Sequence, residues 1–217
     1  MDFEKMINIG ILNLQGDVEE HDIMTSNAFK NMKIKGKTTL VNTLKDVYPC
    51  DGLIISGGES STIGMHLEKT GLDKYIAESS MPILGTCAGL VLLSRNTNKN
   101  QSTLGLMDIS VKRNAFGRQK FSFESEIELD KKIINGVFIR APCVEKIGNN
   151  VKILSELDQK IIAVKENQYI GISFHPELTD DTYIHELFIK EIQDYKKKVR
   201  LNKPKISQKY LLNNKNP

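Results

Sequence analysis

The sequence has few cysteines and no long apolar run. Its three cysteines, Cys50, Cys87 and Cys143, are an odd number spread over 217 residues and make a poor disulfide framework. The longest apolar runs, such as 90–93, are far shorter than the roughly 20 residues of a membrane helix, and residues 1–5 lack a signal-peptide pattern. These absences predict a cytoplasmic protein without membrane contact. One cysteine is expected to be functional, and the other two are expected to have no catalytic role.

Metal-binding and phosphate-binding motifs are also missing. His21, His66 and His185 show no ligand spacing with one another, and no paired-cysteine motif occurs, which argues against a metal hydrolase. No Gly-x-x-x-x-Gly-Lys-Ser/Thr segment is present, so phosphate-loop chemistry is not expected. The sequence therefore predicts a protein with no metal and no cofactor.

The basic residues are concentrated at one end of the chain. The net charge is +3, but 196–217 holds eight of the 30 Lys and Arg residues and no acidic residue, so the rest carries a net charge of −5. Because the Asn-rich end has no periodic apolar face, we expect a disordered basic tail at 199–217 behind one domain at 1–198. A nucleic-acid partner is not expected, although binding of RNA or an acidic partner by this tail is the alternative to a solvated end.

The order of apolar segments is typical of an α/β protein. Buried or β-rich segments that alternate with helical ones predict a mostly parallel central sheet with helices on both faces. These strands are expected at 7–14, 36–41, 52–55, 82–84 and 169–174. Helices are expected at about 17–32, 61–69, 72–78 and 179–198, with Asp17 as the cap of the first. Antiparallel additions to the sheet are expected at 108–112, 121–129, 136–140, 151–157 and 161–166.

A cysteine stands between a predicted strand and a predicted helix. The run Gly85-Thr86-Cys87-Ala88-Gly89 has apolar residues on both sides. Its glycines allow a sharp turn where a β-carbon would clash, and the thiol would then lie over the first turn of the next helix, whose amide dipoles favour a thiolate. The pattern predicts a nucleophile at Cys87.

A base for this thiol follows another predicted strand. His175 and Glu177 are two residues apart, so in extended chain they would project to the same face, and Glu177 would hold the imidazole that reaches Cys87. Such a group suits acyl transfer, in which the thiolate attacks a carboxamide carbon and the imidazole protonates the departing nitrogen. The amides of Gly58 and Ala88 are the expected oxyanion hole. A lone buried cysteine or histidine is an ordinary core residue, but the combination favours catalysis.

Six segments, in this order along the chain, resemble the class I, or triad, glutamine amidotransferases, and within them the glutaminase subunits of pyridoxal 5′-phosphate synthase. They are Gly-Ile-Leu-Asn-Leu-Gln-Gly-Asp at 10–17, Gly-Gly-Glu-Ser at 57–60, Gly-Thr-Cys-Ala-Gly-Leu at 85–90, Arg-Asn-Ala-Phe-Gly-Arg-Gln at 113–119, Phe-Ile-Arg-Ala-Pro at 138–142 and Ser-Phe-His-Pro-Glu-Leu at 173–178. The resemblance runs from about residue 7 to residue 195.

The resemblance implies a flavodoxin-like fold and hydrolysis of L-glutamine to L-glutamate and ammonia without ATP. The ammonia would pass through a tunnel to a separate synthase subunit, in a hetero-oligomeric complex that makes pyridoxal 5′-phosphate. The family's nucleophile falls on Cys87, and its histidine and glutamate fall on His175 and Glu177. Gln15 stands where the family couples partner docking to formation of the oxyanion hole.

The resemblance also assigns the glutamine-binding positions. They fall on Gly58, Glu59, Ser60, Arg113, Ile139 and Arg140. Free glutamine carries an α-ammonium and an α-carboxylate, so an acid such as Glu59 and a cation such as Arg113 or Arg140 suit it. Solvated loop charges are the alternative interpretation for both arginines.

Four positions depart from the family pattern. Ser56 replaces a usual proline and Cys143 a usual histidine, while Gly64 and Met65 replace arginine-like residues. If those arginines meet the synthase, the docking surface here differs in charge. Two other functions stay open: a triad glutaminase for another synthase, such as imidazole glycerol phosphate synthase, and a catalytically silent regulatory subunit, against which the intact triad residues argue.

Overall fold

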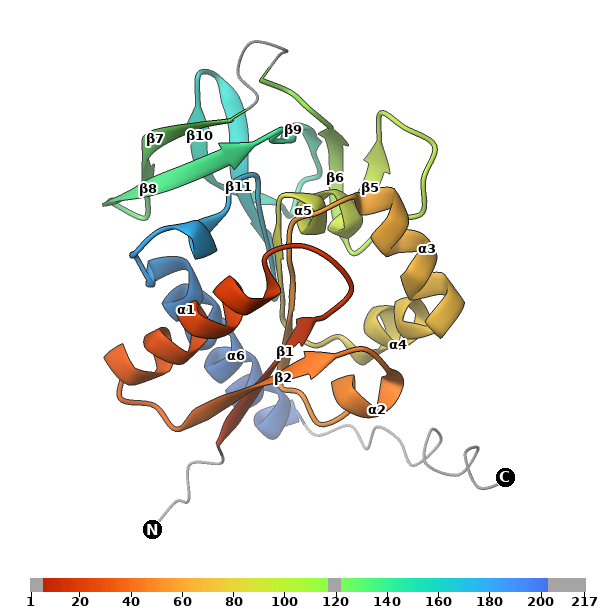
Figure 1. The fold of residues 1–217 in the computed structure, drawn as a ribbon, viewed down its shortest axis with the longest axis vertical. Helices are drawn as coiled ribbons and strands as arrows, with labels where there is room; N and C mark the ends of the chain where they lie inside the picture. The colour runs from red at the N-terminus through yellow and green to blue at the C-terminus, as the bar shows by residue number, and fades with distance from the viewer. Residues whose placement is uncertain (1–5, 117–121, 203–217) are drawn as a thin grey trace.

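The structure, a computed structural model, describes residues 6–116 and 122–202 (Figure 1). The predicted basic tail lies outside the described residues from position 203 onward, as do residues 117–119 of the family segment at 113–119. Within the described part, no helix combines the length and the apolar character that crossing a membrane requires.

Five parallel strands form one half of the main sheet. Their order is β2 (Gly36–Val41), β1 (Ile7–Leu12), β3 (Gly52–Ile55), β4 (Ile83–Thr86) and β12 (Tyr169–Ile172). Every residue of β1, β3, β4 and β12 is buried, as expected for parallel strands that are covered on both faces. Because the strands are parallel, the loops after β1, β3, β4 and β12 meet at one edge of the sheet.

The other half of the sheet is mainly antiparallel. Beyond β12 come β11 (Lys160–Glu166), β9 (Cys143–Ile147), β6 (Met107–Lys112) and β5 (Ser94–Thr97), while β10 (Lys152–Leu157) also pairs with β11. β5 and β6 are parallel to each other. The predicted mostly parallel sheet with antiparallel additions is thus confirmed. The additions predicted at 121–129 and 136–140 were wrong in one respect: β7 (Ser122–Leu129) and β8 (Lys132–Ile139) pair with each other in a separate two-stranded sheet.

Helices cover both faces of the main sheet, as predicted (Figure 1). α3 (Ser60–Thr70), α4 (Leu72–Ser79) and α5 (Ala88–Leu93) contribute to one apolar cluster, together with the short α2 (Leu44–Val47). α1 (Val18–Asn31) and α6 (Tyr183–Asn202) contribute to a second cluster on the opposite face.

The closing helix differs from its predicted bounds. The prediction placed it at about 179–198, whereas α6 spans Tyr183–Asn202. The residues before it form the short 3-10 helix η1 (Pro176–Leu178) and a turn in which the Asp181 carboxylate accepts a hydrogen bond from the backbone N–H of Tyr183 (2.8 Å). The helical spacing itself was correct, because Ile184, Phe188 and Ile192 are all buried.

Candidate active site

Cys87 occupies the sharp turn between β4 and α5. Its backbone has φ +49°, a conformation that is costly for a residue with a β-carbon. A β-carbon on Gly85 would lie 2.6 Å from the carbonyl carbon of Gly89, and one on Gly89 would overlap the carbonyl oxygen of Ile55. The backbone N–H of Cys87 donates to the carbonyl of Ile172 at the end of β12 (2.9 Å). The elbow predicted from the glycine spacing is therefore present, and neighbouring strands hold it in place.

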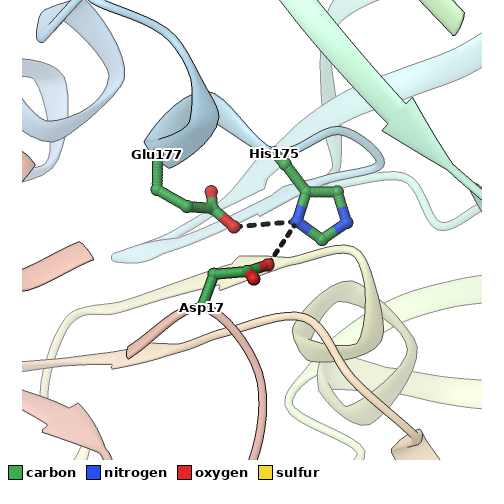
Figure 2. A group of neighbouring side chains, drawn as sticks. All are labelled: Asp17, His175 and Glu177. Atoms are coloured by element: carbon green, nitrogen blue, oxygen red, sulfur yellow. Dashed lines mark hydrogen bonds and ion pairs between the residues drawn. The ribbon is translucent and has the colours of Figure 1, made fainter. Parts of the chain in front are cut away.

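His175 and Glu177 meet at the end of β12. His175 Nδ1 lies 2.8 Å from Glu177 Oε1, and both side chains are buried (Figure 2). The backbone N–H of His175 donates to the carbonyl of Val137 on β8 (2.8 Å), which anchors the main chain from which the ring projects. The expected contact occurs, but its predicted cause was wrong. Glu177 lies in the 3-10 helix η1 and not in extended chain, and the turn of this helix brings the carboxylate to the His175 ring.

Asp17 provides a second carboxylate at the same ring nitrogen. Its Oδ2 lies 3.1 Å from His175 Nδ1, as Figure 2 shows. The sequence predicts Asp17 as the cap of α1, and it does stand at the N-cap position, but its side chain makes no capping hydrogen bond. The ligand atoms of Asp17, His175 and Glu177 lie within 4.8 Å of one another, a spacing that a metal ion could also accept. The metal-free site therefore stays a prediction.

The surroundings of His175 favour its charged form. Burial alone would lower the pKa of His175, but the Cys87 thiol and the Glu177 carboxylate raise it to about 10. The second ring nitrogen, Nε2, is buried and has no hydrogen-bond partner among the described residues. For Glu177, burial raises the pKa, although the contact with His175 opposes that shift. A proton on His175 thus stabilises the buried Glu177 carboxylate.

The loop after β3 lies against His175. A β-carbon on Gly57 would overlap the imidazole, so the ring packs directly on this glycine backbone. Gly58 has φ +123°, which a side chain would strain, and its α-carbon faces Gln15. Gln15 Oε1 accepts a hydrogen bond from the backbone N–H of Glu59 (3.0 Å). Gln15 and Gly58 are thus neighbours, while the oxyanion hole of Gly58 and Ala88 stays a prediction.

The loops after β1 and β3 interlock. Ser56 Oγ donates to the carbonyl of Gln15 (2.9 Å). Gly16 has φ +94°, and a β-carbon there would overlap the carbonyl oxygen of Gly57. Ser56 is where the sequence departs from the family's proline, and its hydroxyl makes a bond that proline could not make. The two loops therefore pack as one unit.

Two of the predicted glutamine-binding residues form an ion pair with each other. Arg113 Nη2 donates to Glu59 Oε1 (2.6 Å), and Arg113 Nη1 donates to Gln101 Oε1 (2.7 Å). Ser60 Oγ lies 3.2 Å from the same Gln101 oxygen. A hydrogen bond from Ser61 and then the Arg113 guanidinium lower the pKa of Glu59, so its carboxylate is ionised. Gln101 was not predicted, because a glutamine in a polar loop carries no distinguishing signal.

Ile139 and Arg140 follow one another at the end of β8 and differ in their placement. Cys87 Sγ lies 3.8 Å from the carbonyl oxygen of Ile139, so this backbone borders the thiol. Arg140 has φ +46° and is exposed, whereas the Arg113 side chain is 13% exposed. Of the two arginines proposed for the α-carboxylate, Arg113 is the one that contacts Glu59.

The parallel sheet, the cysteine elbow and the neighbouring His–Glu pair together define a class I glutamine amidotransferase. A comparison with sequence families agrees, because residues 11–194 match the SNO glutamine amidotransferase family. The chain belongs to this family.

Curated relatives match this chain over nearly their full length. A protein of Methanosphaera stadtmanae named pyridoxal 5′-phosphate synthase subunit PdxT is 65% identical over 87% of this chain and 98% of its own length. A protein of Methanobrevibacter smithii with the same name is 53% identical over 86% and 97% of the two chains.

Solved structures support the fold. A crystal structure described as a glutamine amidotransferase has a TM-score of 0.76 and 35% identity, and the match covers 85% of this chain and 98% of that one. A glutamine amidotransferase of Thermotoga maritima has a TM-score of 0.55 at 16% identity, with coverage of 97% and 90%. The latter likeness concerns the fold alone.

Proposed function

We propose that this chain is the glutaminase subunit of a pyridoxal 5′-phosphate synthase, which releases ammonia from L-glutamine for a separate synthase subunit. The observation that carries the mechanism is the 2.8 Å contact of His175 Nδ1 with Glu177 Oε1, on a ring whose pKa the Cys87 thiol also raises. The names of the relatives support the choice of synthase. The three free cysteines suit the reducing cytoplasm, which is the location we propose.

The first half-reaction forms a thioester. The Cys87 thiolate attacks the carboxamide carbon of glutamine, and the charge that develops on oxygen is met by the amides of Gly58 and Ala88. His175, which holds the thiol proton, gives it to the departing nitrogen, so ammonia leaves. Burial of the imidazole and the carboxylate strengthens these electrostatic contacts, because little water screens them.

The second half-reaction frees glutamate. Neutral His175 removes a proton from water, which attacks the thioester carbon, and the imidazolium then returns the proton to the Cys87 sulfur as it leaves. Glu177 stabilises the imidazolium through Nδ1 in both halves. The ring nitrogen Nε2, which has no partner among the described residues, is the atom proposed to exchange protons with sulfur, ammonia and water.

The Glu59–Arg113 pair supplies the recognition of free glutamine. A zwitterion can place its α-ammonium on the carboxylate and its α-carboxylate on the guanidinium, so it engages both members of the pair. Ser60, Ile139 and Arg140 complete the proposed pocket. A glutamine within a peptide lacks both charges and would leave the pair without an added partner.

Gln15 is the proposed route by which the synthase activates the glutaminase. Its side chain bonds the backbone of Glu59, next to the proposed oxyanion donor Gly58. Contact of a partner with this segment would therefore act on the loop that stabilises the oxyanion. Gly64 lies on α3, buried, and Met65 on the same helix is 61% exposed, so an apolar side chain stands where the family has an arginine-like residue.

The function is tested by reconstitution. The chain is mixed with glutamine and a pyridoxal 5′-phosphate synthase subunit, and the glutamate and vitamer formed are measured for wild type and Cys87→Ala. We expect the variant to bind the synthase but to release no ammonia, and free ammonium to restore vitamer synthesis. Pairing with the synthase of imidazole glycerol phosphate is the control. Activity with that partner alone would reject the proposed synthase, and equal glutamine hydrolysis with and without any partner would reject the role of Gln15.

A further inference from the structure

A buried row of side chains lies behind Glu177. The carboxylate oxygen that faces away from His175, Oε2, lies 3.3 Å from Nε2 of His21 on α1, and it has no hydrogen-bond partner among the described residues. His21 Nδ1 lies 3.0 Å from Nε2 of His185 on α6. Thr86 Oγ1, at the end of β4, lies 3.2 Å from His21 Nε2. His21, His185 and the Glu177 side chain are at most 1% exposed, so these contacts lie in the protein interior.

The chemistry of the row fixes the proton on each ring. An ionised carboxylate repels a nitrogen lone pair, so the approach of Glu177 Oε2 to His21 is favourable when the hydrogen is on Nε2, where Thr86 Oγ1 accepts it. His21 Nδ1 then has a lone pair, which accepts the N–H of His185 Nε2. Burial lowers the pKa of His185 to about 4 and that of His21 well below its usual value, so both rings are neutral. His185 Nδ1 is then unprotonated, and it has no hydrogen-bond partner among the described residues.

We propose that His21 is a positioning residue for the catalytic carboxylate: its Nε2–H, which Thr86 Oγ1 accepts, presents the positive end of its dipole to Oε2 of Glu177 at 3.3 Å, while His185 fixes the tautomer of His21. The inference rests on the proposed function, because it assumes that Glu177 supports His175. His21 would not touch glutamine. It would act by keeping Glu177 ionised and oriented at a position where the pocket supplies few donors.

The charges around Glu177 explain why the N–H dipole of His21 matters. Three groups surround Glu177. His175 Nδ1 lies 2.8 Å from its Oε1, His21 Nε2 lies 3.3 Å from its Oε2, and the Asp17 carboxylate shares His175 Nδ1 with it. Burial raises the pKa of Glu177, and the negative charge of Asp17 adds to this shift. His21 faces Glu177, His185 and Thr86, and the charge of His175 disfavours a proton on it. The neutral His21 N–H therefore favours the carboxylate without placing a second positive charge beside the imidazolium.

The test follows the thiolate of Cys87 rather than turnover. The rate of Cys87 alkylation by iodoacetamide is measured against pH, with the Cys87 peptide quantified by mass spectrometry so that Cys50 and Cys143 are separated. Glu177→Gln removes the carboxylate charge, and we expect it to move the midpoint of the profile to higher pH, since the imidazolium loses its partner. His21→Asn, whose amide can reach His185 but not Glu177, should move the midpoint in the same direction by about one pH unit, a tenfold change in the equilibrium.

Two further variants separate positioning from packing. His21→Gln places an amide N–H near the position of ring Nε2, so we expect its profile to stay close to that of wild type. Thr25→Val alters another fully buried side chain on α1, whose hydroxyl has no partner among the described residues, and should leave the profile unchanged. In the complex with the synthase, His21→Asn should lower kcat about tenfold with little change in KM, because His21 does not contact substrate.

Each outcome bears on one proposal. If Glu177→Gln shifts the profile and His21→Asn does not, the role of His21 is overturned while the proposed triad stands. If Glu177→Gln itself leaves the profile unchanged, the proposed triad fails. Should His21→Asn not fold, as judged by circular dichroism, His185→Leu is used, because it removes the donor that fixes the His21 tautomer. We expect an upward shift for that variant, and a wild-type profile would overturn the inference.

Discussion

At the scale of single residues, the ion pair of Glu59 and Arg113 decides how substrate is recognised. Arg113→Met should raise the KM for glutamine about tenfold to a hundredfold, the range that loss of one charged hydrogen bond gives, with a smaller effect on kcat. Steady-state glutaminase kinetics in the reconstituted complex measure both constants. Arg140→Met is the matched control, because Arg140 is exposed and we expect a smaller rise. A larger effect at Arg140 would assign the α-carboxylate to that residue instead.

The two carboxylates at His175 Nδ1 should contribute unequally. Glu177→Gln is expected to lower kcat by about a hundredfold or more, because an amide can accept at Nδ1 but carries no charge to stabilise the imidazolium. Asp17→Asn should lower kcat less than tenfold, since Glu177 remains and ionises more easily once the Asp17 charge is gone. The kcat values of both variants in the complex check this order. Equal losses would mean that the ring needs both carboxylates.

Site residues could be predicted at this scale where their type and their position at a strand end sufficed. Cys87 lies at a glycine-flanked elbow, and His175 meets Glu177, as expected. His21 and His185 lie 164 residues apart and meet only because α1 and α6 pack on the same face of the sheet. No spacing rule joins such positions, so the absence of ligand spacing gave no sign of their contact.

At the scale of elements, the tight β4–α5 connection predicts that any side chain at Gly89 destabilises the fold. A β-carbon there would overlap the carbonyl oxygen of Ile55, so β3 or α5 would have to move. Gly89→Ala should lower the free energy of unfolding by about 2–3 kcal/mol, as overpacking of a core does, and it should slow alkylation of Cys87. Urea unfolding monitored by circular dichroism measures the change. Gly71→Ala is the control, because Gly71 has φ +73° but open space around it, and we expect a loss of about 1 kcal/mol.

The strands that could be predicted differ in burial from those that could not. β1, β3, β4 and β12 are buried at every residue, and continuous apolar runs revealed them. β5 and β9 were not predicted, because β5 reads Ser-Arg-Asn-Thr and β9 has three exposed residues. Their strand conformation comes from pairing with β6 and β11, which is a tertiary effect.

At the scale of the whole molecule, the buried imidazoles make stability depend on pH. Burial lowers the pKa of His21 and that of His185, the latter to about 4, whereas the unfolded chain binds these protons near pH 6.5. Between pH 6.5 and about 4, the unfolded state therefore binds more protons, and stability falls as pH falls, by up to about 1.4 kcal/mol per pH unit for each ring. Urea midpoints at pH 5 and 6.5 measure this fall, and identical midpoints would contradict it.

The raised pKa of His175 makes stability change with pH in the opposite direction. Because its pKa is raised to about 10, its stabilising contribution is complete below pH 6.5 and is lost as pH rises from 6.5 toward 10. The free energy of unfolding should therefore be highest near pH 6.5. We expect the urea midpoint of the wild type to be lower at pH 8.5 than at pH 6.5. In His175→Gln, the difference between the two midpoints should be smaller. An equal difference in the two proteins would remove His175 as the cause.

The arrangement of the molecule explains why the site could be located from the sequence while the details of its contacts could not. Parallel strands bring the loops after β1, β3, β4 and β12 to one edge, so Gln15, Gly58, Cys87 and His175 were expected near one another. The fold class followed from the same alternation of elements. The contact of Asp17 with His175 depends instead on how one loop bends, and the usual preference of aspartate for helix caps pointed elsewhere.

The interlocked loops that carry Gln15 and Gly57 have a consequence for inhibition. Since the Ser56 hydroxyl ties them and a Gly16 β-carbon would strike Gly57, neither loop can shift by itself. A small molecule that binds on the outer side of the Gln15 loop and displaces it would also displace the Gly57 backbone, on which the His175 imidazole packs. Such a compound could silence the enzyme without competing with glutamine, and raising the substrate concentration would not relieve it.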